Sequence, residues 1–430
     1  MDKILIKNGT VFDTENNTSR IADIFIVDGK IQKIAEGINL EAGKVINAEG
    51  KWVTPGFIDL HAHLRDPGFT DKETIATGSQ SAAAGGFTTI CCMPNTKPAI
   101  HNAEVVSYIK EKSIKEAPVN VLPIGAITYG QQGNELTDIE EMYKSGICAL
   151  SEDGKSVLSA QKLKEAMLIA KRYDLPVFSH CEDMSLVNGG CINEGCASKL
   201  LNLKGISDDS ESVIVARDIA LAESTGARLH ICHISTKSSI NFVRDAQKRG
   251  VKVTAEACPH HFALCDEFIK SPDTNTKMNP PLRSRENMEA LREALKDGTV
   301  SVIATDHAPH TAEDKNKPYD KAPFGIVGFE TALSLGVTYL VEGGILTPME
   351  LIKKMTYNPA KIIKSAAGVI KEGNTADITI TDPNEEYTVS CEEFVSKSKN
   401  SPFGGFKLKG RVKYTICGGK VVYDNSRTVV

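Results

Sequence analysis

The chain repeats one pattern eight times: a short apolar run, then a polar cluster, then a stretch with helical periodicity. The apolar runs fall at residues 56–60, 87–92, 119–124, 147–150, 176–179, 228–232, 251–255 and 300–304. Helical stretches between them include 159–173, 210–224, 238–249 and 285–297, and several begin near a serine that can cap a helix. Strands that alternate with helices pair in parallel, and eight such units close into a barrel. The sequence therefore predicts an α/β fold, a (β/α)8 TIM barrel.

The two chain ends differ from the barrel region, which we assign to residues 54–370. Residues 1–53 and 371–430 alternate apolar and polar residues with period two, and turn signals such as Asn8-Gly9 interrupt the pattern. Each end alone is too short to form a stable pair of sheets. We therefore expect both ends to form one small β-sandwich domain beside the barrel.

Composition excludes several function classes. The chain has 430 residues, of which 41% are hydrophobic, so it can bury a large core. Its net charge is −5 and it has no long basic block, so we expect no nucleic-acid partner. Its first residues lack a signal-peptide core and no apolar run reaches about 18 residues, so we expect a cytoplasmic protein without a membrane partner. The 11 cysteines lie mostly in apolar runs, as is typical of reduced buried thiols.

Metal-ligand side chains follow five of the predicted strands. In such barrels, functional residues come from the carboxyl ends of the strands and from the loops after them. The candidates are His61, His63, the acidic pair Glu152-Asp153, His180, His233 and Asp306. Imidazoles and carboxylates suit Zn²⁺ and similar ions, and six ligands, counting one carboxylate of the acidic pair, are too many for one tetrahedral ion. The set therefore predicts two divalent metal ions, with Zn²⁺ favoured, bridged by a carboxylate.

Arg65 adds a cation beside this set. It follows His61 by four residues and shares its strand parity, and its planar guanidinium can grip a carboxylate with two hydrogen bonds. Two divalent ions, two ligand carboxylates and one hydroxide would leave about one positive charge before Arg65 is counted. The site should therefore bind a small anionic substrate.

Five phrases, in this order, resemble the amidohydrolase superfamily and, within it, the monofunctional bacterial dihydroorotases. They lie at residues 56–68, 93–96, 277–283, 304–310 and 322–325. The resemblance implies that His61 and His63 bind one ion, that His180 and His233 bind the other, that Asp153 bridges them, and that Asp306 is both a ligand and a proton shuttle. It also implies that Arg65, Asn95, Asn279 and His310 bind the substrate carboxylate, and that the backbone at Phe324 and Gly325 contacts the ring amides.

The activity implied by this resemblance is the reversible hydrolysis of (S)-dihydroorotate to N-carbamoyl-L-aspartate in de novo pyrimidine (UMP) biosynthesis. Two ions would share one hydroxide and lower its pKa, while one of them polarises the carbonyl that it attacks. Asp306 would act as general acid and base, taking the proton of that hydroxide and passing it to the departing ring nitrogen.

Two other functions stay open. Another cyclic amidase, such as a hydantoinase (dihydropyrimidinase) or an allantoinase, would bridge its metals with a carboxylated lysine on the fourth strand, where residues 146–151 offer none. Lys155, which shares the parity of Asp153, is the alternative bridge. A non-catalytic dihydroorotase-like scaffold for aspartate transcarbamoylase would typically lack metal ligands, and all six are present. We expect a homodimer and leave an association with aspartate transcarbamoylase open.

Other residues near these positions have structural interpretations. His230 and His307 have the opposite parity to the candidate ligands beside them, and His260-His261 are expected to surround the site rather than bind metal. Cys181, Cys191 and Cys196 lack CxxC spacing and are expected to be inert. Residues 310–328 are bounded by Pro and Gly, and we expect this loop to become ordered when substrate binds.

Overall fold

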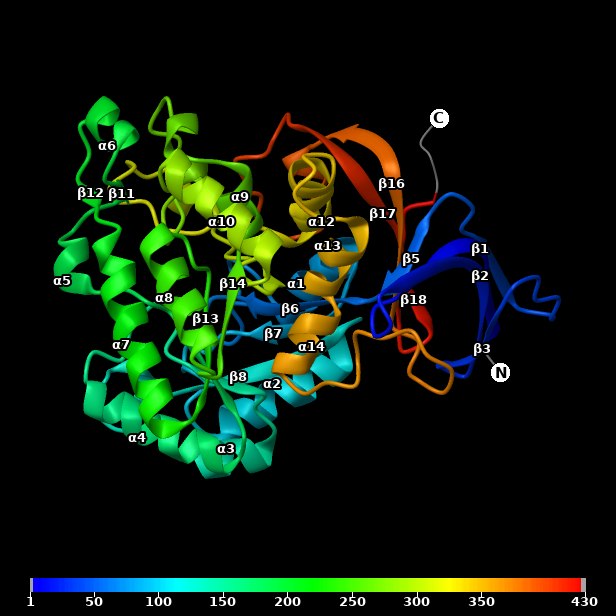
Figure 1. Cartoon of the computed structure of the whole chain (residues 1–430), viewed down its shortest axis with the longest axis horizontal. Coiled ribbons are helices and arrows are strands. Elements are labelled where there is room, and N and C mark those ends of the chain that lie inside the picture. The colour runs from blue at the N-terminus through cyan, green and yellow to red at the C-terminus, as the bar shows by residue number, and fades with distance from the viewer. Residues whose placement is uncertain (1–2, 427–430) are drawn as a thin grey trace.

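The computed structural model describes residues 3–426, and its barrel is built from eight parallel strands (Figure 1). These are β6 (Phe57–Ala62), β7 (Phe87–Cys92), β8 (Asn120–Ala126), β9 (Ala149–Ser151), β10 (Pro176–Ser179), β13 (Arg228–Ile231), β14 (Val253–Ala257) and β15 (Val302–Ile303). The strands pair in sequence order from β6 to β15. Each strand overlaps one predicted apolar run, so the prediction of a (β/α)8 barrel is confirmed.

The barrel closes between β6 and β15 through isolated contacts. Ala62 and His307 form a parallel bridge, and the His63 N–H donates to the His307 carbonyl at 2.9 Å. His307 forms a second bridge with Ile326. Since β15 spans two residues, it is too short for a regular ladder with β6. The seam between the first and last strands is therefore held partly by loop residues.

Helices cover the outside of the barrel, and most of them start at a capping side chain. They are α1 (Ile75–Ala84), α2 (Ala103–Glu116), α3 (Ile139–Ser145), α4 (Ala160–Arg172), α7 (Asp209–Thr225), α8 (Lys237–Lys248), α10 (Arg285–Asp297), α12 (Ala332–Leu335), α13 (Pro348–Met355) and α14 (Tyr357–Ile362). Ser159 and Ser284 cap α4 and α10 through their hydroxyls. The four predicted helices are confirmed, each boundary to within one residue. No helix within residues 3–426 is long and apolar enough to span a membrane.

Short elements lie in the loops. They are β11 (Ile192–Asn193), β12 (Gly205–Ile206), α5 (Met184–Val187), α6 (Cys196–Leu201), α9 (Pro259–Ala263), α11 (Ala312–Lys315), η1 (Tyr129–Gln131), η2 (Asp266–Phe268), η3 (Thr274–Thr276), η4 (Phe329–Thr331), η5 (Gly336–Val341) and η6 (Cys391–Glu393). Buried side chains such as Leu60, Phe178 and Val302 pack together in one core cluster of the barrel. All cysteines are free thiols, as the sequence predicts.

The two chain ends share one sheet beside the barrel (Figure 1). Its strands are β1 (Lys3–Asp13), β2 (Thr18–Val27), β3 (Lys30–Ala35), β4 (Lys44–Asn47), β5 (Trp52–Pro55), β16 (Ile378–Thr388), β17 (Lys407–Cys417) and β18 (Lys420–Asp424). The antiparallel pairing of β5 with β16 joins the two ends. Isoleucines such as Ile6, Ile24 and Ile378 form its core. The expectation that both ends join in one β unit beside the barrel is confirmed, and its strands are connected in one sheet where the sequence predicts a sandwich.

One segment of the C-terminal region leaves this sheet for the barrel mouth. Between β16 and β17, the Ser396 hydroxyl donates to Glu73 at 2.6 Å and the Ser398 hydroxyl donates to the Lys72 carbonyl at 2.7 Å. Both acceptors lie in the loop after β6. The division into residues 1–53 with 371–430 and residues 54–370 stays a prediction, and residues 396–400 cross it.

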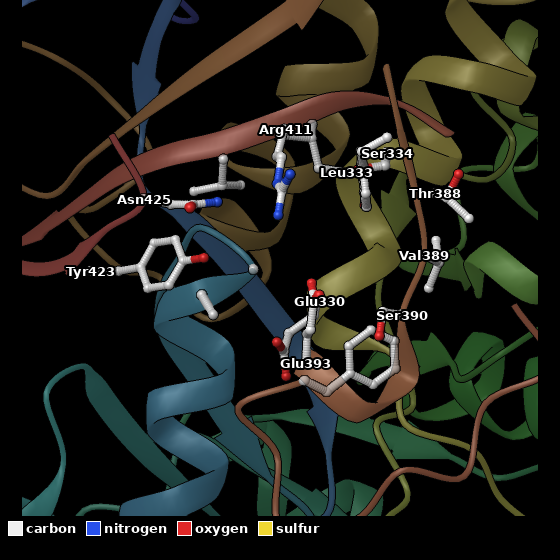
Figure 2. A pocket seen from close by; sticks show the side chains of 15 residues that line it. Glu330, Leu333, Ser334, Thr388, Val389, Ser390, Glu393, Arg411, Tyr423 and Asn425 are labelled. Carbon is white, nitrogen blue, oxygen red and sulfur yellow. The ribbon is translucent and has the colours of Figure 1, made fainter. Parts of the chain in front are cut away.

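A small cavity of about 80 Å³ lies where α1 and α12 meet β16, β17 and β18, and we call it the junction cavity. Figure 2 shows the Arg411 guanidinium pointing into it above the carboxylates of Glu330 and Glu393, with Tyr423 at one side. Glu330 accepts hydrogen bonds from the Ser81 hydroxyl and from the N–H groups of residues 395 and 396. Its carboxylate is therefore satisfied within the chain.

Candidate functional site

A second cavity, of about 220 Å³, opens at the carboxyl ends of the barrel strands, and we call it the mouth cavity. Its lining consists of His63, Arg65, Asn95, Asp153, Gly154, His180, His233, Asn279, Asp306, Ala308, His310, Phe324 and Gly325. Every site residue predicted from the sequence lines this cavity except His61, which is fully buried. The structure therefore brings the predicted residues together from separate strand ends and loops.

Asp153 is at the centre of the four candidate imidazoles. Its Oδ1 lies 3.2 Å from His61 Nε2, 3.6 Å from His180 Nδ1 and 3.9 Å from His233 Nε2. Its Oδ2 lies 3.5 Å from His63 Nε2. One carboxylate thus contacts all four imidazoles, with Oδ1 facing three of them and Oδ2 facing His63, so it is placed to be shared between two ions.

Asp306 completes a second group on the β6 side. Its Oδ1 lies 3.0 Å from His63 Nε2 and 3.5 Å from His61 Nε2. Close ligand-atom groups therefore form at His61, His63 and Asp306 and at His61, Asp153 and His233. His180 lies at the edge of the second group, with its Nδ1 2.9 Å from His233 Nε2.

Two buried atoms of the cluster show that it fits metal ions. Among the described residues, neither His61 Nε2 nor Asp153 Oδ1 has a hydrogen-bond partner, although they lie only 3.2 Å apart. Leaving buried polar atoms unpaired costs free energy, so such atoms call for a ligand. Nitrogen and oxygen ligands of one Zn²⁺ ion lie about 3 to 3.5 Å from each other. The donor set and its spacing therefore fit divalent ions.

The charges of the cluster favour ionised carboxylates. Burial opposes the charge of Asp153 and Asp306, but His61 and its neighbours outweigh burial and lower the pKa of both carboxyl groups. Burial likewise opposes a charged His61, and the surrounding carboxylates nevertheless raise its pKa. Metal ligands must be deprotonated, and both aspartates are already in that form at neutral pH.

Glu256, on β14, was missed by the sequence interpretation. Its Oε1 lies 2.7 Å from His61 Nδ1, and its Oε2 lies 3.0 Å from His230 Nε2. Burial opposes its charge, but these histidines lower its pKa to about 2. Glu256 thus orients His61, as carboxylates commonly orient metal-binding histidines. A glutamate directly after the predicted apolar run 251–255, at the carboxyl end of a barrel strand, is the signal that could have found it.

Backbone geometry limits the use of strand parity at the site. Arg65, His233 and Asp306 have φ angles of 60°, 33° and 48°, in the left-handed region that non-glycine residues seldom adopt. All three lie beyond the ends of their strands. Period-two alternation therefore does not extend to Arg65 or from Asp306 to His310, although these side chains do line the mouth cavity.

Arg65 and His310 form one wall of the mouth cavity, which we call the cationic wall because it carries the Arg65 charge. Arg65 Nε donates to the Pro309 carbonyl at 3.2 Å, and burial lowers its pKa to about 10, so it stays charged at neutral pH. His310 Nε2 lies 2.8 Å from the Phe324 carbonyl. Burial and the nearby cations, Arg65 first, lower the His310 pKa to about 2. His310 is therefore neutral, with Nε2–H as the donor to Phe324.

The two asparagines contact the candidate ligands. The Asn95 side chain lies 2.9 Å from His63 Nδ1 and donates to Asp153 Oδ2 at 3.2 Å. Asn279 Nδ2 donates to Glu182 at 3.0 Å, and Glu182 lies 3.3 Å from His180 Nε2. Asn95 therefore also orients the cluster, and Glu182 links Asn279 to it.

The alternative bridge, Lys155, points elsewhere. Its Nζ donates to the Gln131 carbonyl at 2.9 Å, and Glu152 accepts from the N–H groups of Ile127 and Thr128. His261 Nε2 donates to the Pro280 carbonyl at 2.8 Å. The His307 ring accepts from the Gly328 N–H at 3.2 Å. The contacts of His261 and His307 agree with the structural roles expected for them from the sequence.

Known proteins resemble this chain over most of its length. A family model described as dihydro-orotase-like matches residues 50–239. A protein named dihydroorotase from Acetivibrio thermocellus is 52% identical over 419 residues, which cover 97% of this chain and 98% of the relative. One from Caldanaerobacter subterraneus subsp. tengcongensis is 51% identical over 425 residues, covering 99% and 98%. The solved structure of L-hydantoinase (dihydropyrimidinase) from Arthrobacter aurescens has a TM-score of 0.90 at 26% identity, covering 100% of this chain and 98% of the other.

Proposed function

We propose, because the chain belongs to the dihydroorotase family, that it catalyses the reversible hydrolysis of (S)-dihydroorotate to N-carbamoyl-L-aspartate in de novo pyrimidine (UMP) synthesis. The enzyme is a metal-dependent cyclic amide hydrolase. The observation that carries the proposal is the position of Asp153 among four imidazoles, in a cavity that Arg65 also lines. We propose a cytoplasmic homodimer and keep an association with aspartate transcarbamoylase as an open proposal.

The metal ligands are the six residues named from the sequence. His61 and His63 would hold one ion, His180 and His233 the other, with Asp153 between them and Asp306 as a further ligand. Two divalent ions, with Zn²⁺ favoured, would activate the attacking water and polarise the carbonyl. The unpaired His61 Nε2 and Asp153 Oδ1 support this assignment.

Asp306 is the proposed general acid and base. Its carboxylate faces the mouth cavity, and its lowered pKa keeps it ionised at neutral pH, which is the form that can accept a proton. In ring opening it takes the proton of the attacking water and passes it to the departing ring nitrogen. In ring closure the same carboxylate takes the proton from that nitrogen.

Substrate binding is proposed to depend on the cationic wall. Arg65 would bind the carboxylate of dihydroorotate, helped by Asn95, Asn279 and His310. The Gly325 N–H already donates to the Lys277 carbonyl at 3.0 Å. The Gly325 N–H is therefore already occupied. The Phe324 carbonyl accepts from His310 and has a second lone pair, so it can also accept from a ring N–H.

The alternative of a hydantoinase or allantoinase has weaker support. Residues Ala149–Ser151 of β9 include no lysine, and Lys155 points to Gln131. The high TM-score with a hydantoinase reflects a shared fold, which by itself does not set the substrate. The scaffold alternative also has weaker support, because the six candidate ligands are gathered at one cavity.

The test measures metal content and hydrolysis of dihydroorotate, dihydrouracil and hydantoin on one purified sample. We expect dihydroorotate to be the preferred substrate, and we expect kcat of Asp306→Asn, compared with wild type at matched metal content, to fall at least about a hundredfold. Asp245→Asn, on the exposed face of α8, is the matched control and should behave as wild type. Preference for a neutral ring would favour the hydantoinase alternative. A metal-loaded protein without turnover would favour the scaffold.

A further inference from the structure

Residues 396–400 form a strap across the seam of the barrel, and we call them the seam strap. Ser396 and Ser398 bind the loop after β6, as described above. The strap then reaches Asn400, which is 5% exposed and lies beside the loop after β15. A part of the C-terminal region is thus packed against both loops that carry the cationic wall.

Asn400 uses both its side chain and its backbone in hydrogen bonds to the cavity wall. Its Oδ1 accepts from the His310 N–H at 3.2 Å, and its Nδ2 donates to the carbonyls of Ala308 at 3.1 Å and Gly325 at 3.0 Å. Its own carbonyl accepts from the Val327 N–H at 2.9 Å. A carboxamide offers one acceptor and two donors in one plane, so it fits this set of partners.

Gly325 is fixed from a second side by Lys315. The Lys315 ammonium, which is 6% exposed, donates to the carbonyls of Gly325 at 2.9 Å and Pro323 at 3.1 Å. Gly325 has a φ of 128°, and a Cβ there would lie 2.7 Å from the Ala308 Cβ. The loop that carries Phe324 therefore has little freedom while both Asn400 and Lys315 are bound to it.

We propose that Asn400 is a positioning residue that sets the substrate-binding wall at His310 and Phe324, with Lys315 as its partner on the other side of Gly325. The proposal rests on the proposed function for its substrate. Asn400 lines no part of the mouth cavity, so it acts through residues that do. Displacing a binding group by about 1 Å is enough to change catalysis strongly, so this indirect role should be measurable.

Asn400→Asp is the sharpest variant, since it keeps the volume and the acceptor for the His310 N–H. It removes both donors and puts a carboxylate oxygen beside two carbonyl oxygens. We expect KM for dihydroorotate to rise about tenfold or more while kcat changes less than about threefold, as for a loss of uniform binding. Metal content should stay as in wild type. Asn384→Asp, exposed on β16, controls for the added charge and should leave KM unchanged.

Hydrogen exchange of the metal-loaded protein without substrate gives a readout that does not depend on turnover. The amides of residues 308–327 should exchange faster in Asn400→Asp and in Lys315→Met than in wild type. Asn400→Ser, which is smaller and neutral, is the second variant if Asn400→Asp does not fold.

Three outcomes separate the hypotheses. An active wild type whose Asn400 variants show unchanged KM and unchanged exchange would overturn the positioning role. Loss of kcat in proportion to lost metal, with KM unchanged, would also overturn it and leave only a structural role. Absence of dihydroorotate turnover in the metal-loaded wild type would instead refute the proposed function, and the exchange result would still test whether Asn400 holds the wall.

Discussion

The mouth cavity and the junction cavity look alike in composition but differ in how their polar groups are satisfied. Both are lined by carboxylates and an arginine. In the junction cavity, Glu330 accepts three hydrogen bonds, and Arg411 lies over the Tyr387 ring, 4.8 Å from its centroid. In the mouth cavity, His61 Nε2 and Asp153 Oδ1 have no hydrogen-bond partner within residues 3–426. Polarity alone therefore does not mark a reactive site, whereas unpaired buried ligand atoms that lie close together at one cavity call for a metal ion.

The strongest way to break this comparison is to delete one carboxylate from each cavity. Asp153→Ala should lower kcat/KM by about a thousandfold or more, because both proposed ions lose a shared ligand. Glu330→Ala should keep kcat/KM within about twofold and lower the free energy of unfolding by about 2 kcal/mol, since its hydrogen-bond donors become unpaired. Kinetics and urea unfolding of the two variants check this. Equal losses of activity would show that catalysis does not depend on the mouth cavity more than on the junction cavity.

The two arginines give a second comparison. Arg65→Met should raise KM for dihydroorotate about 10- to 100-fold, because a charge-assisted hydrogen bond contributes about 1.5 to 3 kcal/mol. Arg411→Met should leave KM unchanged, because its side chain contacts Glu385 and Tyr387. Steady-state kinetics decide it. A normal KM in Arg65→Met would remove this residue from the proposed substrate wall.

Metal affinity should depend on the residues that contact the proposed ligands and not on those of the junction cavity. Glu256→Gln keeps the shape of the side chain but weakens the support of His61, so affinity should fall about 10- to 100-fold. Glu330→Gln is the matched change in the junction cavity and should not alter it. Chelator competition at a fixed pH measures both. Unchanged affinity in Glu256→Gln would mean that His61 keeps its orientation without this contact.

Acidification should change the free energy of unfolding with opposite sign through His261, which is near the mouth cavity, and through Glu330, which lines the junction cavity. Burial lowers the His261 pKa to about 4, so below pH 6.5 the unfolded chain takes up a proton that the folded chain does not. His261 therefore lowers the free energy of unfolding by about 1.4 kcal/mol between pH 7.5 and 5.5. Burial raises the Glu330 pKa, so its contribution is largest at low pH and is lost as pH rises through the folded-state pKa.

The measurement is urea unfolding at both pH values for wild type and for His261→Gln, which can still donate to the Pro280 carbonyl. The difference between the two proteins cancels shared effects such as metal release. Wild type should lose about 1.4 kcal/mol more than the variant on acidification. Parallel losses would show that His261 takes up its proton in the folded protein as well.

The fold was accessible from the sequence because its signals are periodic and local. Eight apolar runs and capping serines such as Ser159 predict the barrel and its helices without any long-range information. The two chain ends could be paired because neither end can bury its apolar face alone. The seam was not accessible, since it depends on the short β15 and on contacts of His307 in space.

The site was accessible to the extent that residue type and strand ends determine it. His61 and His63 are recognisable from their spacing, whereas the position of Arg65 follows from a left-handed backbone that strand parity does not describe. Glu256 carries a signal of the same kind, a carboxylate directly after the apolar run 251–255. Asn400 carried none, because its partners are backbone groups of loops about 75 to 90 residues away.

The seam strap has a consequence for the order of events during synthesis of the chain. All six proposed metal ligands have been made once residue 306 has been added, but Asn400 follows 94 residues later. Chains are made from the N-terminus, and folding can begin before synthesis ends. A nascent chain can therefore gather its metal ligands while its substrate wall is still unfixed, and a chain that stops before residue 400 would carry the ligands without the support that the finished enzyme gives to His310.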